Sequence, residues 1–357
     1  MGAVREIELK PNALIRCDAS PLIGGGHVMR CLTLANALKG AGWRVRFACV
    51  EGTAEVVSAL ARSGFELIEL INPLDADELV GKLDGHFDAI VFDHYDIDSN
   101  YERALRPFAD ILVVIDDLAD RRHDCDLLID QTFGRSAADY QGLVPVHAEV
   151  LAGSQYALLR PEFAQARPRA LARHSDGRPV KRILISMGLT DIGSITEKVL
   201  GAVLEADTGA SVDVVVGSRA SSLSAVHELA AQHTNVSVYV DAADIGSLMV
   251  DADLAVGAAG ATTWERCCLG LPTITVVLAD NQRIIGDRLA AVEAIVLVND
   301  FDIGKFSAMV ANLVADRQRL KMISLAAAQI TDGMGAQKVV SSLTSSRQQC
   351  GSGAHNL

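Results

Sequence analysis

The chain has 357 residues, too many for one ordinary core and a suitable length for two domains. Half of the residues are apolar, only 4% are aromatic, and 29 glycines stand against 9 prolines, which favours parallel sheets buried between helices over an aromatic β-sandwich. The net charge of -13 argues against a nucleic-acid partner, which needs a basic face. A single bound nucleotide stays possible, because a few backbone N–H groups can hold a pyrophosphate.

The cysteines and the start of the chain indicate a cellular location. Seven cysteines, an odd number, form no C-x-x-C pair and mostly lie inside apolar runs, so we expect reduced core thiols rather than disulfides or a metal site. Residues 1–10 lack the apolar stretch of a signal peptide. No run reaches the roughly 18 uninterrupted apolar residues of a membrane span. We therefore expect a cytoplasmic protein without a membrane partner, and the oligomeric state stays open.

The first half of the chain alternates short apolar runs with one clear helical pattern. Residues 27–40 predict the first helix, because apolar side chains recur on one face and Gly40 can end it. This alternation is typical of βαβ units and a parallel sheet. Buried strands are expected at residues 13–18, 45–50, 65–71, 88–93, 111–116 and 127–130.

The pattern breaks at residues 160–181, which hold three prolines and many arginines, and then restarts. A linker is the simplest interpretation of this break. Further strands are expected at 182–186, 212–217, 236–240, 254–257, 273–278 and 295–298, with long helices from 303 to about 343. The sequence thus predicts an N-terminal extension (1–13), a first Rossmann-like domain (14–165), a linker (166–180), a second Rossmann-like domain (181–343) and a flexible tail (344–357). The carboxyl ends of both sheets would face a cleft.

The loop between the first strand and the first helix carries the strongest chemical signal. Gly24, Gly25 and Gly26 permit positive φ and close approach of a ligand. His27 then stands near a helix N-terminus, where the dipole keeps the imidazole neutral and able to act as a base. Arg30 follows one turn later. The loop fits neither G-x-G-x-x-G nor a P-loop, so neither NAD nor ATP is supported, and a tight turn with an incidental histidine is the alternative.

Polar clusters follow other strands of the first half. Asp93-His-Tyr95-Asp-Ile-Asp98 comes directly after an apolar strand, where these side chains can hydrogen-bond polar groups of a ligand. Asp116 and Asp130 also end strands. Such acids serve either as helix caps and turn formers or as ligands of a divalent metal, and the first alternative is favoured.

The sharpest motif of the second half runs from Asp253 to Glu265, where a buried strand leads into a loop of small residues and then a helix. Gly257 and Gly260 allow close backbone approach, and the helix start with Thr262 and Thr263 offers donors to a diphosphate without a metal. Glu265 has two interpretations. It either holds a ligand or completes a Thr262-x-x-Glu265 capping box.

Two further loops belong to this half. Asp280, Asn281 and Gln282 follow an apolar strand and would face the cleft, with a polar helix cap as the alternative. Gly188 and Asp191 follow the first strand of the half, and residues 239–241 are expected near the base of a nucleotide.

The segment D-A-S-x-x-I-G-x-G-H-V-M-R-C-L, which begins at Asp18, resembles the opening of the UDP-sugar hydrolases of pseudaminic acid synthesis, relatives of the glycosyltransferase that makes lipid II. The resemblance extends over residues 14–342, with four motifs in the family's order. It implies the GT-B fold, that is, an α/β architecture of two Rossmann-like domains whose parallel sheets face a cleft. Where the family has a second glycine in the loop at Gly188, this chain has leucine.

The resemblance also implies the reaction, in which water hydrolyses UDP-2,4-diacetamido-2,4,6-trideoxy-β-L-altropyranose with inversion, without a metal or cofactor. His27 would activate the water, while Tyr95 and Asn281 would position sugar or water. Glu265 would hold the ribose hydroxyls. The full set expected to bind substrate is Asp18, Gly25, Gly26, Arg30, Asp93, Gly188, Gly260, Thr262, Thr263, Glu265, Asp280 and Gln282.

Two other functions remain open at this stage. An inverting GT-B glycosyltransferase would use the same histidine and nucleotide loop, but it would need an apolar, basic patch facing the membrane on the first domain, and the sequence indicates none. A non-catalytic nucleotide-sugar-binding protein would not require His27.

Overall fold

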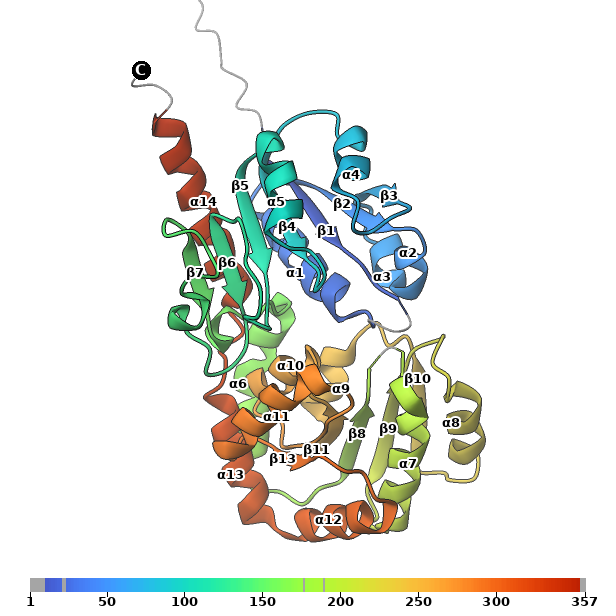
Figure 1. Cartoon of the computed structure of the whole chain (residues 1–357). Coiled ribbons are helices and arrows are strands. Elements are labelled where there is room, and N and C mark those ends of the chain that lie inside the picture. The colour runs from blue at the N-terminus through green and yellow to red at the C-terminus, as the bar shows by residue number, and fades with distance from the viewer. Residues whose placement is uncertain (1–9, 21–23, 176, 189, 354–357) are drawn as a thin grey trace, which may run out of the picture.

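The computed structural model describes residues 10–20, 24–175, 177–188 and 190–353, except for the side chains of Ser175, Ile192, Asn281 and residues 349–353. Figure 1 shows two α/β domains stacked on one another, with the first half of the chain forming the upper one. No helix in the described ranges is both long and apolar enough to cross a membrane.

The first domain is built on a parallel sheet of seven strands in the order β3-β2-β1-β4-β5-β6-β7. All the strands expected in this half are present, and β7 is an addition that the sequence analysis missed. The strands are β1 (Asn12–Cys17), β2 (Arg44–Val50), β3 (Glu66–Leu70), β4 (Phe87–Asp93), β5 (Ala109–Ile115), β6 (Leu127–Asp130) and β7 (Glu149–Ala152). The helices are α1 (Gly26–Gly40), α2 (Thr53–Val56), α3 (Ser58–Ala61), α4 (Ala76–Lys82) and α5 (Ser99–Leu105), with short 3-10 turns at Arg106–Phe108, Ala137–Tyr140 and Ser154–Tyr156.

The second domain repeats this plan with a parallel sheet of six strands in the order β10-β9-β8-β11-β12-β13. Every strand expected here is present. The strands are β8 (Arg182–Ser186), β9 (Ser211–Val216), β10 (Val236–Val240), β11 (Leu254–Ala258), β12 (Thr273–Val276) and β13 (Val296–Val298). The helices are α6 (Pro161–Ser175), α7 (Ile195–Glu205), α8 (Leu223–Ala230), α9 (Ile245–Asp251), α10 (Thr262–Cys268), α11 (Asp280–Ala291), α12 (Ile303–Ala315), α13 (Arg317–Ala328) and α14 (Gly335–Gly353), with a 3-10 turn at Ile192–Ser194.

Both sheets bury their two faces, as continuous apolar strands require. In β1, Ile15 packs into the core that contains α1, whereas Leu14 belongs to the core on the opposite face. In β8, Ile185 and Leu184 divide in the same way between two cores. The alternation follows from the two-residue period of a strand.

The expected linker is wrong over most of its length, because residues 161–175 form helix α6. The side chains of Phe163 and Ala170 lie two turns apart on one face of α6, and both are buried. This contact with the core stabilises a helix that also carries several arginines. Arg167 shows one structural role of the arginines in this helix. It donates to the carbonyl oxygens of Cys268 (2.5 Å) and Ala328 (2.6 Å), which end α10 and α13.

The expected flexible tail is also wrong as far as residue 353, because α14 continues to Gly353. Figure 1 shows this red helix running back beside the first domain, where it packs against α1 and β5. Val339 and Leu343 lie four residues apart in the first domain's core, and Arg347 continues that face to reach Asp88 at 2.6 Å. The chain therefore crosses between the domains twice, and the domain boundaries expected from the sequence stay a prediction.

Candidate active site

The residues of interest gather where the strand order of each sheet reverses. In the first sheet this switch point lies between β1 and β4, and in the second it lies between β8 and β11. Open parallel sheets bind ligands at such points, beyond the carboxyl ends of the strands. The loops that follow β1 and β8 meet across the domain boundary, since a Cβ placed on Gly24 would lie 4.0 Å from Oγ1 of Thr190.

The glycine loop positions the start of α1. Of its glycines, only Gly24 has a positive φ, of 80°, whereas Gly25 is the N-cap with φ of -103° and Gly26 is the first helical residue. Among the described residues, no side chain caps this helix, and the Gly25 carbonyl accepts from the Met29 N–H at 3.0 Å. The helix start thus holds His27 next to the end of β4.

His27 is a buried histidine with a defined tautomer. Its Nδ1 lies 2.6 Å from Oδ1 of Asp93, the last residue of β4. A carboxylate accepts a hydrogen bond, so Nδ1 is the donor in this short contact, and a terminal nitrogen of Arg30 lies farther from it, at 3.1 Å. With the proton on Nδ1, the lone pair of the imidazole is on Nε2. The rings of Tyr95 and His27 form a T-shaped pair with centroids 4.6 Å apart and planes at 86°, which restricts rotation of the imidazole.

Asp93 joins the histidine to Arg30. The Arg30 Nε donates to Oδ2 at 2.7 Å, and one terminal nitrogen donates to Oδ1 at 2.6 Å. Burial alone raises the pKa of Asp93, but the charge of Arg30 and the contacts with Arg30 and His27 outweigh burial and hold the pKa well below its usual value. Asp93 is therefore a fixed anion beneath the histidine.

Arg30 is occupied by carboxylates. Its other terminal nitrogen donates to Asp117 at 2.9 Å, and the side chain is 6% exposed. Burial disfavours the charged guanidinium, yet the charges of Asp93 and Asp117 raise the pKa of Arg30. The sequence placed Arg30 on the substrate. The structure places it against Asp93 and Asp117, where it orients the partner of His27.

Asp18 is likewise turned inward. Arg16 donates to both of its oxygens, at 2.6 and 2.7 Å, and the Val50 N–H donates at 2.7 Å. His94 Nδ1 accepts from the Asp96 N–H at 3.0 Å, so its Nε2 carries the proton toward Asp18, 3.3 Å away. Through these contacts Asp18 stabilises the loop after β1.

The acids at the ends of β5 and β6 form hydrogen bonds within the turns that follow these strands. Asp116 accepts from the Ala119 N–H at 2.8 Å, and Asp130 accepts from the Thr132 N–H at 2.7 Å. Arg121 lies 2.8 Å from Asp116 and Arg135 lies 2.9 Å from Asp130. This is the turn-forming role that the sequence favoured over metal binding. Among the residues the structure describes, no group of three or more histidine, cysteine or acidic side chains is arranged to hold a metal ion.

The loop after β11 leads into α10 without a capping box. The N-cap is Ala261, and no side chain caps the helix, so the capping interpretation of Glu265 is wrong. One Glu265 oxygen lies 3.5 Å from a terminal nitrogen of Arg160, while the other, Oε2, is buried with no hydrogen-bond partner in the described part of the chain. Burial raises the pKa of Glu265 despite Arg160. A buried acceptor that lacks a donor is a place for a ligand hydroxyl.

The loop after β8 is held by Asp191. This residue has a positive φ of 47° and is 1% exposed. Its carboxylate accepts from the N–H (2.9 Å) and hydroxyl (2.6 Å) of Thr196 and from the Ser222 hydroxyl. Gly188, with φ of 110°, presents backbone only. Asp191 thus shapes the loop from within.

The expected D-N-Q segment starts α11. Asp280 is exposed, and Gln282 turns back to accept from the Leu278 N–H at 3.1 Å. The Asn281 side chain lies outside the part of the chain that the structure describes, so its place is known only as the first turn of the helix. Arg288 of the same helix donates to the Phe133 carbonyl at 3.1 Å, which brings α11 against the first domain.

The sequence analysis missed two arginines at the nucleotide loop, Arg160 and Arg266. Arg160 belongs to the supposed linker and approaches Glu265. Arg266 is buried in α10. An arginine directly before the apolar residues Cys267, Cys268 and Leu269 is the only signal that the sequence offered for Arg266.

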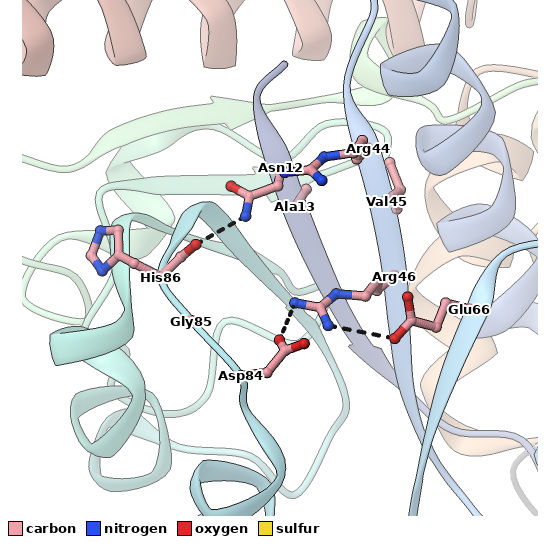
Figure 2. Close-up of a pocket in the computed structure, with 9 residues that line it drawn as sticks. All are labelled: Asn12, Ala13, Arg44, Val45, Arg46, Glu66, Asp84, Gly85 and His86. Atoms are coloured by element: carbon pink, nitrogen blue, oxygen red, sulfur yellow. Dashed lines mark hydrogen bonds and ion pairs between the residues drawn. The ribbon is translucent and has the colours of Figure 1, made fainter. Parts of the chain in front are cut away.

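A hollow of about 410 Å³ lies elsewhere, at the amino-terminal edge of the first sheet (Figure 2). Its charged side chains pair with one another. Arg46 lies 2.8 Å from Asp84 and 3.5 Å from Glu66, and the Asn12 amide donates to the His86 carbonyl at 2.9 Å. This hollow is separate from the switch point.

The two stacked parallel-sheet domains define the GT-B fold, and solved structures agree. Acinetobacter baumannii MurG matches with a TM-score of 0.65 at 16% identity, over 94% of this chain and 100% of that one. The spinosyn rhamnosyltransferase SpnG gives 0.60 at 15% identity, over 94% and 100%. Arabidopsis thaliana UGT89C1 complexed with UDP gives 0.60 at 12% identity, over 94% and 100%. The predicted fold is confirmed.

Sequence similarity is more specific. The chain is 26% identical over 282 residues to the UDP-2,4-diacetamido-2,4,6-trideoxy-β-L-altropyranose hydrolase of Campylobacter jejuni, covering 78% of this chain and 95% of that protein. It is 24% identical over 271 residues to an uncharacterized protein of Methanocaldococcus jannaschii, covering 74% of this chain and 55% of that one. No family model matches the chain.

Proposed function

We propose that the chain is a UDP-sugar hydrolase that releases UDP from UDP-2,4-diacetamido-2,4,6-trideoxy-β-L-altropyranose, in pseudaminic acid biosynthesis in the cytoplasm. One observation carries the proposal. His27 stands at the switch point with Nδ1 held 2.6 Å from Asp93, so that Nε2 is the basic nitrogen. The similarity to the Campylobacter jejuni hydrolase supports the choice of substrate.

His27 acts as general base. Nε2 removes a proton from water while the water oxygen bonds to the anomeric carbon and the bond from that carbon to the β-phosphate oxygen breaks. UDP leaves with the electron pair, and attack from the opposite face inverts the anomeric centre. Protonation of Nε2 gives the ring a positive charge. The fixed negative charge of Asp93 attracts and thereby stabilises this imidazolium.

Arg30 and Tyr95 support this base. Arg30 donates to both oxygens of Asp93, which keeps that carboxylate ionised and oriented. Tyr95 forms a T-shaped pair with the imidazole and thereby limits its rotation. With Asn281, Tyr95 positions the sugar or the water. We propose that Arg30, Asp93 and Asp18 act through these contacts rather than by touching the substrate.

The second domain holds UDP. Glu265 Oε2, buried and without a donor, accepts from the ribose hydroxyls. The backbone of Gly188 and Gly260 and the hydroxyl of Thr262 face the diphosphate, with Gly25 and Gly26 across the domain boundary. The Thr263 hydroxyl, expected to do the same, is buried and donates to the Ala258 carbonyl at 3.2 Å, so it supports the loop instead. Asp280 and Gln282 complete the site. This division, with the base in residues 14–165 and UDP in residues 181–343, needs no metal to support departure of UDP.

The test is incubation with this UDP-sugar, with and without EDTA, while free UDP and free sugar are followed. Release of both products in EDTA supports the proposal. His27→Gln should bind UDP and fail to turn over, whereas His227→Gln, an exposed histidine on α8, should match the parent enzyme. UDP release that requires an added acceptor would favour the second candidate, an inverting glycosyltransferase. The similarity in fold to SpnG is the observation that suggests this candidate.

A further inference from the structure

Arg266 is a buried cation that forms no salt bridge with any described residue. It is 2% exposed, and its hydrogen bonds go to neutral oxygens: the Ala258 carbonyl (2.7 Å) and the hydroxyls of Thr262 (3.0 Å) and Thr263 (3.1 Å). Its Nε is buried without a partner among the described residues. Within that part of the chain, no carboxylate oxygen lies within ion-pair distance of this guanidinium. The protein thus keeps a positive charge here without neutralising it.

The other deeply buried arginines show how unusual this is. Arg16 has Asp18 at 2.6 Å, and Arg30 has Asp93 at 2.6 Å. Burial lowers the pKa of Arg266 to about 10, because the lost hydration outweighs the opposing effect of the nearby Glu265 charge. At neutral pH the group remains charged. A buried charge without a counter-ion is costly, so a ligand that brings the negative charge is the natural compensation.

The fold is built to accommodate this guanidinium. A Cβ on Gly257 would lie 2.7 Å from the Arg266 Cζ, so Gly257 makes room for arginine rather than for a ligand. At Gly260, by contrast, a Cβ would meet nothing within 4 Å among the described atoms. The charge therefore lies directly under the loop between β11 and α10, while the outer side of that loop at Gly260 is open.

The two threonines differ in what their hydroxyls can still do. Thr263 accepts from Arg266 and donates to the Ala258 carbonyl at 3.2 Å, so its hydrogen is used. Thr262 accepts from Arg266 at 3.0 Å, and no described residue accepts the hydrogen of its hydroxyl. An anionic oxygen bound to that hydroxyl would lie about 5 Å from the guanidinium, close enough for direct attraction in a partly buried site.

Two incompletely paired groups therefore adjoin in one turn of α10: Glu265 Oε2, which has no donor among the described residues, and Arg266, which forms no salt bridge with them. A nucleoside diphosphate carries the complement of both, namely vicinal hydroxyls and a polyanion. We propose that Arg266 is a positioning residue for the diphosphate, acting from beneath the loop through the Thr262 hydroxyl, which it orients and polarises as a donor. The inference rests on the proposed function, because it takes UDP as the ligand.

The test compares affinities for UDP, UMP and uridine by titration calorimetry. Arg266→Met should weaken UDP binding about 10- to 100-fold, the range of a lost charged hydrogen bond, and leave uridine unchanged. Arg266→Lys should recover part of the loss, since it restores charge without the planar fork. Arg319→Met, an exposed arginine of α13, is the matched control and should change neither affinity.

Thr262→Val removes the hydroxyl without touching the buried charge, so it keeps the test decisive if Arg266→Met does not fold. It should weaken UDP but not uridine, and its cost should shrink in the Arg266→Met background, because the two groups act together. Equal loss of UDP and uridine affinity, or a folded Arg266→Met with parental UDP affinity, overturns the inference; if Arg266→Met does not fold, parental UDP affinity of Thr262→Val overturns it. A parent protein that binds neither UDP nor UMP overturns the proposed function as well.

Discussion

Nδ1 of His27 lies 2.6 Å from Oδ1 of Asp93, and the same carboxylate receives two hydrogen bonds from Arg30. The contact joins the first turn of α1 to the last residue of β4, the strand beside β1 in the sheet. It favours the tautomer with the proton on Nδ1 and leaves Nε2 as the nitrogen that we propose as the base. Most of the account depends on this pair.

Replacing the base should separate binding from turnover. His27→Gln retains a polar side chain near Asp93 but cannot accept the proton of water. We expect kcat to fall about 10²- to 10⁴-fold, the usual contribution of a general base. UDP affinity should change little, because the UDP contacts that we propose do not include the His27 side chain. Stopped assays of UDP release and calorimetry of UDP binding measure the two effects, and a fully active His27→Gln would place the base elsewhere.

Neutralising the partner should affect both turnover and stability. Asp93→Asn leaves Arg30 and His27 without the carboxylate between them, and removal of one member of a buried ion pair typically costs about 3–5 kcal/mol. We expect kcat to fall at least about 10-fold, because the imidazolium loses its stabilising charge. Urea unfolding and kcat are the measurements. An Asp93→Asn with parental kcat would show that Asp93 does not assist the base.

The free energy of unfolding should depend on the Asp93 carboxylate at acidic pH. The folded-state pKa of Asp93 lies below its unfolded value of about 3.9, so its contribution to stability is complete above about pH 4 and disappears as the pH falls toward the folded-state pKa. The free energy of unfolding of the parent protein should therefore decrease below about pH 4 more steeply than that of Asp93→Asn. Parallel curves for the two proteins would contradict the assigned ionisation of Asp93.

Glu265→Gln should move binding and stability in opposite directions. The buried Oε2 has no donor among the described residues, so removing its charge should raise the Tm of the ligand-free protein. UDP binding should weaken about 10- to 100-fold through loss of charged hydrogen bonds to the ribose. UDP lacking both ribose hydroxyls is the control ligand, since the parent and Glu265→Gln should bind it equally. A penalty that persists with this analogue would assign Glu265 another contact.

The return of α14 to the first domain predicts a stability effect. Leu343 is 1% exposed in the core beside α1, and Leu343→Ala should lower the free energy of unfolding by about 2–5 kcal/mol. Ser345→Ala, exposed on the same helix, should stay within about 0.5 kcal/mol of the parent. Urea denaturation distinguishes them. Equal stability of both variants would mean that the helix does not pack as described.

The sheets could be predicted from the sequence because buried parallel strands are continuous apolar runs, and α1 because its apolar face is regular. The segment 161–175 could not, since its helix depends on arginines that donate to carbonyls distant in sequence, as Arg167 does. The continuation of α14 beyond residue 343 could not be predicted for a similar reason. Its contact with Asp88 through Arg347 lies 259 residues away in the sequence.

The site was predictable as a set of positions, but less so as a set of roles. His27 and Tyr95 lie together, with Asp93 bound to His27. Arg30 and Asp18 carry the types of side chain that substrates need, yet they pair with other protein groups. Only the folded chain shows which charge has a partner. Gly257 makes the same point, because the close approach that its glycine permits is that of Arg266.

The most direct test of the account is hydrolysis of the UDP-sugar in water enriched in oxygen-18, with EDTA present, followed by mass spectrometry of both products. Attack of water activated by His27 on the anomeric carbon predicts one heavy oxygen in the released sugar and none in UDP. Inversion predicts that the sugar first appears as the anomer opposite to the substrate. Heavy oxygen in UDP, or no release of UDP from the parent enzyme, would contradict the central claim.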